Sequence, residues 1–267
     1  ILAESCPRLE EYAGRIVKAV SLGAPAYNAG DPGACYRIYR QTAEGIVSGV
    51  TLVGDLMQDL AARVSAEVRG PQVLAGIEER LRGGARALRL RPGRYVFATV
   101  HRAENRTPEA LRAWTALLSS VARPDRPVVL AIHPGTLLAL DREGIAPGPP
   151  VFLVEPQGYR TSIALQLHAA AVITDSGGVQ REAAWLGTPC LVLRGTTEWV
   201  ETLTGSGGRM VVVGLDAGRA LAELERLAPD AAAGTLAAER TAWLDLRPAG
   251  AAEAISAALA STGGGGG

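Results

Sequence analysis

Cysteine and histidine, the side chains from which disulfides and most zinc sites are built, are scarce in this 267-residue sequence. Three residues of each type occur: Cys6, Cys35, Cys190, His101, His133 and His168. A disulfide framework needs several cysteines at paired spacings, and a zinc site needs cysteine or histidine ligands close together in sequence. We therefore expect neither a disulfide framework nor a metal site.

An excess of charge and long apolar runs are also missing. Lys plus Arg and Asp plus Glu both number 27, so the formal net charge is zero. A neutral chain creates no long-range field that would gather nucleic acid or anionic lipid. No run reaches the roughly 18 apolar residues of a spanning helix, and the start lacks the pattern of a signal peptide. We expect no nucleic-acid or membrane partner, and a cytoplasmic location.

What is present is an alternation of apolar runs of strand length with amphipathic runs of helix length. The strands are expected at Tyr95–Val100, Pro127–Ile132, Val151–Val154, Ala171–Thr174, Cys190–Leu193 and Met210–Val213, with a further first strand at Val50–Val53. The helices are expected at Leu56–Val68, Val73–Leu81, Pro108–Val121, Tyr159–His168, Val179–Leu186, Glu198–Thr204, Gly218–Leu227 and Ala251–Leu259. This alternation predicts an α/β fold with a doubly wound, Rossmann-like parallel sheet.

Three segments follow from this pattern. Residues 1–45 are an unassigned leading segment or a remnant of another domain, because their turn-rich sequence continues no strand-helix alternation. Residues 46–260 form the expected Rossmann-like domain with a closing helix. Residues 261–267 end in five glycines, and such a tail is too free in conformation to pack.

The run Asp175-Ser176-Gly177-Gly178 carries the most chemical information, because it joins a strand to a helix without a loop. Two glycines let the backbone approach a ligand, and the free amides at the helix start favour an anion. Glu182 follows one helical turn later, where its carboxylate can reach two vicinal ribose hydroxyls. The alternative is a tight turn in which Asp175 or Ser176 caps the helix and Glu182 is exposed.

Other candidates follow the expected strands. His101 and Arg102 follow one strand, His133 follows the next, and Arg194 follows a later one. Ligands of open α/β sheets bind at these carboxyl ends. A structural role for either histidine, and an ion pair or helix cap for Arg194, are the alternatives. We interpret His168 as structural.

Four stretches resemble the UDP-N-acetylglucosamine 2-epimerase family. Thr174–Glu201 is similar to the family signature, and Thr99–Asn105 contains its His-Arg-x-Glu-Asn strand end. Glu155–Tyr159 and Leu52–Asp59 also match, in the expected order. The resemblance covers roughly residues 42–260. It implies the second half of a two-domain GT-B-type epimerase fold, the half that holds UDP.

The resemblance implies a role for each part of the site. Ser176, Gly177 and Gly178 would bind phosphate, Glu182 the ribose, and the segment 157–159 the uracil. His101, with the amides at Ser176, would stabilise the departing diphosphate and is the candidate catalytic residue. The candidate substrate-binding residues are Arg102, His133, Tyr159, Ser176, Gly177, Gly178, Glu182 and Arg194.

The family reaction interconverts UDP-N-acetylglucosamine and UDP-N-acetylmannosamine. It removes the C2 proton, eliminates UDP to leave a glycal, and adds UDP back to the inverted sugar, with no cofactor. UDP-N-acetylglucosamine is the expected partner, and a homodimer is compatible with the sequence.

Two departures bear on this expectation. Residues 1–41 do not match the first domain, which supplies the acidic groups, and Gly135 stands where the family often carries an arginine. A non-catalytic UDP-sugar-binding protein and a two-Rossmann-domain glycosyltransferase are therefore alternatives.

Overall fold

The computed structural model describes residues 14–22, 25, 31, 34, 37–42, 54–79, 85–228 and 250–262. The chain divides into two compact units, residues 1–53 and residues 54–267. Within the first unit, residues 14–22 and 37–42 are helical. The strand expected at Val50–Val53 and the glycines after Thr262 lie outside the described residues.

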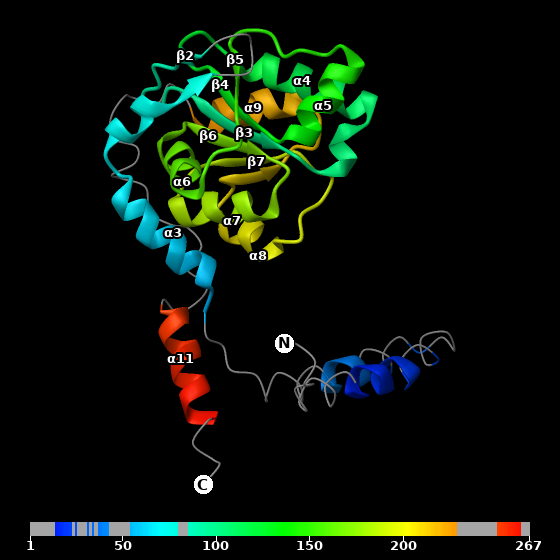
Figure 1. The fold of residues 1–267 in the computed structure, drawn as a ribbon. Coiled ribbons are helices and arrows are strands. Elements are labelled where there is room, and N and C mark those ends of the chain that lie inside the picture. Colours follow the sequence, from blue (N-terminus) through cyan, green and yellow to red (C-terminus); the bar gives the residue numbers. More distant parts are fainter. Residues whose placement is uncertain are drawn as a thin grey trace. The chain divides into compact units, whose positions relative to one another are not determined.

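The second unit is built on a six-stranded parallel sheet, which confirms the expected fold class (Figure 1). Its strands are β3 (Val96–Val100), β4 (Val128–Ile132), β5 (Val151–Val154), β6 (Ala171–Thr174), β7 (Cys190–Val192) and β8 (Met210–Val212). Their order across the sheet is β5-β4-β3-β6-β7-β8. The chain therefore winds outward from β3 to β5, returns to the other side of β3, and winds outward again to β8.

Helices cover both faces of this sheet. Figure 1 shows α4, α5 and α9 on one face and α6 and α7 on the other. The described helices of the second unit are α3 (Leu56–Glu67), α4 (Pro108–Val121), α5 (Pro134–Glu143), α6 (Tyr159–His168), α7 (Gly177–Leu186), α8 (Val200–Gly205), α9 (Ala217–Leu227) and α11 (Ala251–Thr262). None of the described helices is long and apolar enough to cross a membrane.

Alternation along the strands divides the core into two layers. Val96 and Leu130 pack with Trp114 of α4 and Leu224 of α9. Phe97 alternates with Val96 along the strand, faces the other side, and packs in the second layer with residues of α6 and α7. Burial of both faces explains why these strands are almost uniformly apolar in sequence.

The segment expected as a helix at Val73–Leu81 is different in the structure. A 3-10 helix, η1 (Pro71–Gly76), is followed by a strand, β1 (Glu78–Glu79), which pairs in antiparallel fashion with β2 (Arg86–Ala87). The N–H of Leu88 donates to the carbonyl of Ile77 at 3.0 Å, and both side chains join the core. The sequence interpretation was wrong here because burial of these two residues favours an extended chain over helical continuation.

Helix α5 was not expected from the sequence. It starts with Pro134 at N1 and ends at Gly144, which has a φ of 64°. Its periodic apolar signal is weak because only Thr136 and Leu140 are buried. Proline at the start and glycine after the end were nevertheless helix signals in the sequence.

Helix α11 is joined to α3 through one carboxylate. Asp59 of α3 accepts hydrogen bonds from the N–H of Gly250 at 3.1 Å and from the N–H of Ala251 at 2.7 Å. The acceptor side chain thus satisfies free amides at the start of a helix about 190 residues later in the chain.

Candidate functional site

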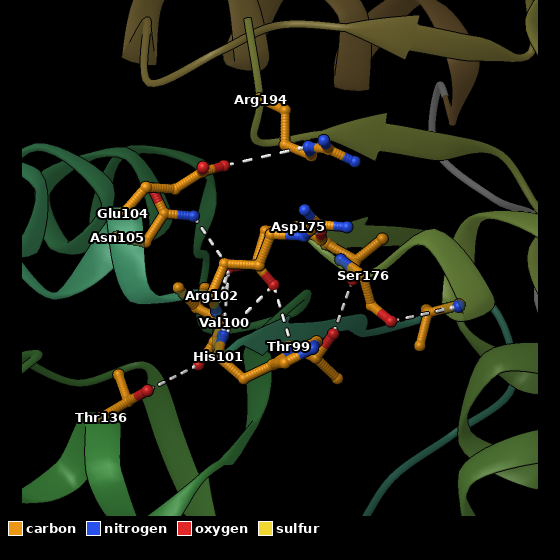
Figure 2. A network of polar contacts seen from close by, with 12 residues as sticks. Thr99, Val100, His101, Arg102, Glu104, Asn105, Thr136, Asp175, Ser176 and Arg194 are labelled. Atoms are coloured by element: carbon orange, nitrogen blue, oxygen red, sulfur yellow. Dashed lines mark hydrogen bonds and ion pairs between the residues drawn. The ribbon is translucent and has the colours of Figure 1, made fainter. Parts of the chain in front are cut away.

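The candidate site lies where β3 and β6 end side by side. Thr99 pairs with Thr174 in the register of these parallel strands, and their hydroxyl oxygens are 2.6 Å apart. The chain leaves both strands at the same edge of the sheet (Figure 2). The reversal of winding between these strands makes this edge the switch point where ligands of open α/β sheets bind.

Asp175 is the centre of the polar network at this edge. Its buried carboxylate accepts from the N–H of Arg102 at 2.9 Å, from Asn105 Nδ2 at 2.8 Å, and from the N–H of His101. His101 Nδ1 also lies 3.2 Å from Asp175 Oδ1. Burial alone would raise the pKa of Asp175, but these hydrogen bonds and His101 together lower it below its usual range.

The loop after β3 is held from several sides. Arg102 Nε donates to the carbonyl of Asp175 at 3.0 Å, and Arg106 Nη2 donates to the carbonyl of His101 at 2.6 Å. Thr136 of α5 donates to the carbonyl of Val100 at 3.1 Å. These contacts fix the positions of His101 and Arg102. Figure 2 shows the contact of Thr136 with Val100 and those of Asp175 with Asn105 and His101.

Ser176 is the N-cap of α7. Its Oγ accepts from the N–H of Val179 at 3.4 Å, and its own N–H donates to Thr174 Oγ1 at 2.9 Å. Of the two alternatives for the cap, the structure selects Ser176 and not Asp175. The carboxylate of Asp175 faces the loop after β3, so only residues 176–178 form the turn that can bind an anion.

Gly177 sits under two side chains of the loop after β7. A Cβ at this position would lie 2.7 Å from Trp199 Nε1 and 2.8 Å from Glu198 Oε1. A side chain at residue 177 would therefore require Trp199 and Glu198 to shift. At Gly178 the nearest atom to such a Cβ is Ser176 Oγ at 3.9 Å, so packing leaves room for a side chain at this position.

A hollow of about 220 Å³ lies beside this turn. The ends of β3 and β4 and the starts of α6 and α7 form its walls, and its polar lining residues are Thr99, His101, His133, Gln157 and Ser162. His133 is the N-cap of α5, because its Nδ1 accepts from the N–H of Gly135 at 3.0 Å. The two predicted histidines thus face the same hollow.

Glu182 and Tyr159 lie behind the hollow and do not line it. Glu182 is 8% exposed, and its Oε2 accepts a hydrogen bond from Gln166 Nε2 at 2.6 Å. The alternative in which the Glu182 side chain is exposed is therefore wrong. Burial raises the pKa of Glu182, against the effect of this hydrogen bond. Burial, followed by the charge of Glu182, raises the pKa of Tyr159 to about 12.

Arg194 brings a second arginine to the site. Its guanidinium forms an ion pair with Glu198, and its Nε lies 3.9 Å from Glu104 Oε1. Glu198 Oε1 also accepts from Arg102 Nη2 at 3.1 Å. Arg102 and Arg194 therefore converge on one carboxylate beside the start of α7.

The structure gathers most of the predicted residues at one edge of the sheet. His101, Arg102, His133, Ser176, Gly177, Gly178 and Arg194 lie there, with Tyr159 and Glu182 behind them. His168 is structural, as interpreted, since its Nε2 lies 2.9 Å from the carbonyl of Val68. The role of Asp175 as organiser of the loop after β3 was missed. Glu198 was expected in the same loop as Arg194, as a pocket-lining residue or in an ion pair or cap, and the structure pairs it with both arginines. Among the described residues no group of three acidic, histidine or cysteine side chains is arranged to hold a metal ion.

Comparison with known proteins gives a consistent result. A family model described as UDP-N-acetylglucosamine 2-epimerase matches residues 40–259. A UDP-N-acetylglucosamine 2-epimerase homolog of Methanococcus maripaludis is 32% identical over 70% of this chain and 50% of its own. A UDP-2,3-diacetamido-2,3-dideoxy-D-glucuronate 2-epimerase of Pseudomonas aeruginosa is 36% identical over 61% of this chain and 41% of its own. The chain thus spans about half the length of these curated relatives or less.

Solved structures are similar in fold. The UDP-GlcNAc 2-epimerase of Methanocaldococcus jannaschii, in complex with UDP-GlcNAc and UDP, aligns with a TM-score of 0.59 at 21% identity. The alignment covers 82% of this chain and 59% of that one. The enzyme of Neisseria meningitidis bound to UDP-GlcNAc aligns with a TM-score of 0.57 at 20% identity, over 84% and 59% of the two chains.

Proposed function

This chain belongs to the UDP-N-acetylglucosamine 2-epimerase family, and from that membership we propose that its second unit binds the UDP moiety of a nucleotide sugar. The proposal rests on one observation, which is that the start of α7 and the loop after β3 lie together at one edge of the sheet. The amides of Gly177 and Gly178 start α7, and Asp175 fixes the loop of His101 and Arg102 next to them. Backbone amides at a helix start and guanidinium groups are the usual ligands of phosphate.

Each part of UDP has a proposed place. The diphosphate lies over residues 176–178, with Arg102 and Arg194 as cationic partners. The base enters the hollow lined by Gln157 and Ser162. Glu182 binds the ribose, which requires its buried carboxylate to exchange Gln166 for the two hydroxyls or to bind them together with it.

The proposed reaction is epimerisation at C2 of UDP-N-acetylglucosamine. The names of the curated relatives agree on UDP and on C2 but differ in the sugar. The chemistry needs a base near C2 and stabilisation of the departing diphosphate. His101, Arg102 and the amides at the start of α7 are suited to the second task, because they present hydrogen-bond donors to the developing negative charge.

The experiment that tests this proposal separates binding from turnover. The chain is incubated with UDP-N-acetylglucosamine in deuterated water, and both exchange at C2 and the melting temperature are followed, with ADP as the control nucleotide. Exchange at C2 would support the epimerase. A rise in melting temperature without exchange would restrict the chain to nucleotide-sugar binding, since a ligand that binds only the native state stabilises it. The absence of both responses would overturn the proposal.

A further inference from the structure

An acidic side chain of the protein itself occupies the proposed diphosphate position. Glu198 Oε1 lies 2.8 Å from the point where a Cβ on Gly177 would stand. Gly177 is the first residue of α7, and the first amides of a helix have no acceptor within it. The carboxylate therefore sits at the positive end of the α7 dipole, where an anion is favoured.

This carboxylate also binds both arginines that the proposed function assigns to the diphosphate. Arg102 Nη2 donates to Glu198 Oε1 at 3.1 Å, and Arg194 pairs with the other oxygen, Oε2. The N–H of Glu198 itself lowers the pKa of this carboxyl most, and the two arginines lower it further against the effect of burial. Glu198 thus makes the ion pairs with these two arginines that a phosphate group would make.

The charges of the cluster leave little attraction for a second anion. Arg102, Arg106 and Arg194 contribute three positive charges; Glu104, Asp175 and Glu198 contribute three negative charges. With His101 neutral, the formal sum is zero. A diphosphate adds at least two negative charges, so it binds favourably only if one carboxylate leaves.

Of the three carboxylates, Glu198 is the one placed to leave. Asp175 is buried and holds the loop after β3, and Glu104 is 3.9 Å from Arg194 and does not reach the start of α7. The side chain of Glu198 is 42% exposed, so rotation about its own bonds carries the carboxylate into solvent.

The backbone around Glu198 is held in place while its side chain is exposed. Thr197 Oγ1 donates to Gln180 Oε1 of α7 at 2.7 Å and accepts from the N–H of Trp199 at 3.1 Å. The Trp199 ring stacks under Arg181, whose guanidinium carbon is 4.3 Å from the ring centroid. A rotation of the Glu198 side chain, without a loop movement, therefore frees Arg102 and Arg194, while Trp199 stays next to Gly177.

We propose that Glu198 is a resident anion of the diphosphate site, and that UDP binding displaces its carboxylate and takes over Arg102 and Arg194. This inference rests on the proposed function, because it presupposes that the diphosphate binds at the start of α7. It assigns Glu198 a positioning role: it keeps both arginines oriented in the free protein and lowers the affinity for the nucleotide.

The test compares UDP affinity by calorimetry in the wild-type chain, Glu198→Gln and Glu201→Gln. Glutamine keeps the size of residue 198 and removes its charge, so we expect UDP to bind about three- to tenfold more tightly. The gain should shrink as salt is raised, because screening weakens the repulsion that was removed. Glu201 is exposed on α8 and has no ion pair among the described residues, so its variant controls for net charge.

Each outcome separates this inference from the proposed function. Tighter binding by Glu198→Gln but not by Glu201→Gln supports the resident anion, as does binding by Glu198→Gln alone. If the wild-type chain binds UDP and Glu198→Gln binds it equally well or more weakly, the inference is overturned and the proposal of UDP binding stands. No binding by any of the chains overturns both. Glu198→Ala, which also removes the charge, should give the same direction and guards against an effect peculiar to glutamine.

Discussion

At the scale of single residues, the carboxylate of Asp175 determines the stability of the site. Asp175→Asn places an amide NH2 among three N–H donors, and we expect it to lower the free energy of unfolding by about 3 kcal/mol. Urea denaturation at neutral pH measures the loss. Asp125→Asn, at an exposed position, is the matched control and should change stability little.

The pH dependence of that loss follows from the lowered pKa of Asp175. A carboxyl whose pKa is lower in the folded state contributes stability above its unfolded pKa of about 3.9 and loses it as the pH falls through the folded value. The difference between wild type and Asp175→Asn should therefore narrow as the pH is lowered below about 4. A difference that stays constant as the pH falls further below about 4 would contradict the assignment.

The pKa shift of Glu182 is opposite in direction to that of Asp175. Burial raises its pKa in the folded state, so its contribution to stability is complete below the unfolded pKa of about 4.3 and declines as the pH rises. We expect Glu182→Gln to be as stable as wild type at pH 7 or more so, yet to bind UDP about 10- to 100-fold more weakly through loss of a charged hydrogen bond to the ribose. Unaltered UDP binding would assign Glu182 a structural role only.

The sequence predicted the positions of the site residues better than their contacts. Residues that follow strands, such as His101 and Arg194, are visible in the sequence because strand ends are visible. The partners of Asp175 are not, since they lie 70 or more positions away and depend on the pairing of β3 with β6. The burial of Glu182 depends in the same way on Gln166 of another helix.

At the scale of secondary-structure elements, the strands of the sheet were predictable because each is an apolar run buried on both faces. The helices α4, α7 and α9 were predictable from their apolar periodicity and their cap residues. Helix α5 was not predicted because its two buried residues give too weak an apolar period. The segment Val73–Leu81 was predicted as a helix because its apolar spacing fits both a helix and an extended chain. Tertiary packing decides between these conformations.

Two adjacent glycines at the start of α7 differ in the space around them, and this difference leads to a prediction. Gly177→Ala would drive a methyl group into Trp199 and Glu198, and we expect it to lower stability by about 1–3 kcal/mol. Gly178→Ala meets no such contact and should raise stability by about 0.5 kcal/mol through the entropy of the unfolded chain. Thermal or urea unfolding of the two variants checks the contrast; equal effects would contradict the packing described.

At the scale of the whole second unit, one side chain attaches the last helix. Asp59→Ala removes the acceptor of the Gly250 and Ala251 amides, and we expect residues 251–262 to exchange their amide hydrogens about tenfold faster. Asp59→Asn keeps one acceptor oxygen and should have a smaller effect. Hydrogen exchange followed by mass spectrometry is the measurement, and equal protection in Asp59→Ala and wild type would contradict this attachment.

The pairing of β3 with β6 also has a consequence for the timing of assembly during synthesis. Every bond between Asp175 and the loop after β3 joins residues at least 70 positions apart, so β3, β4 and β5 are complete before the carboxylate exists. A nascent chain halted at residue 170 would carry His101 and Arg102 on an unorganised loop. Because such non-local contacts form late, nucleotide capture by a ribosome-bound chain should begin only after α7 has left the exit tunnel, which makes UDP a reporter of how far the sheet has been assembled.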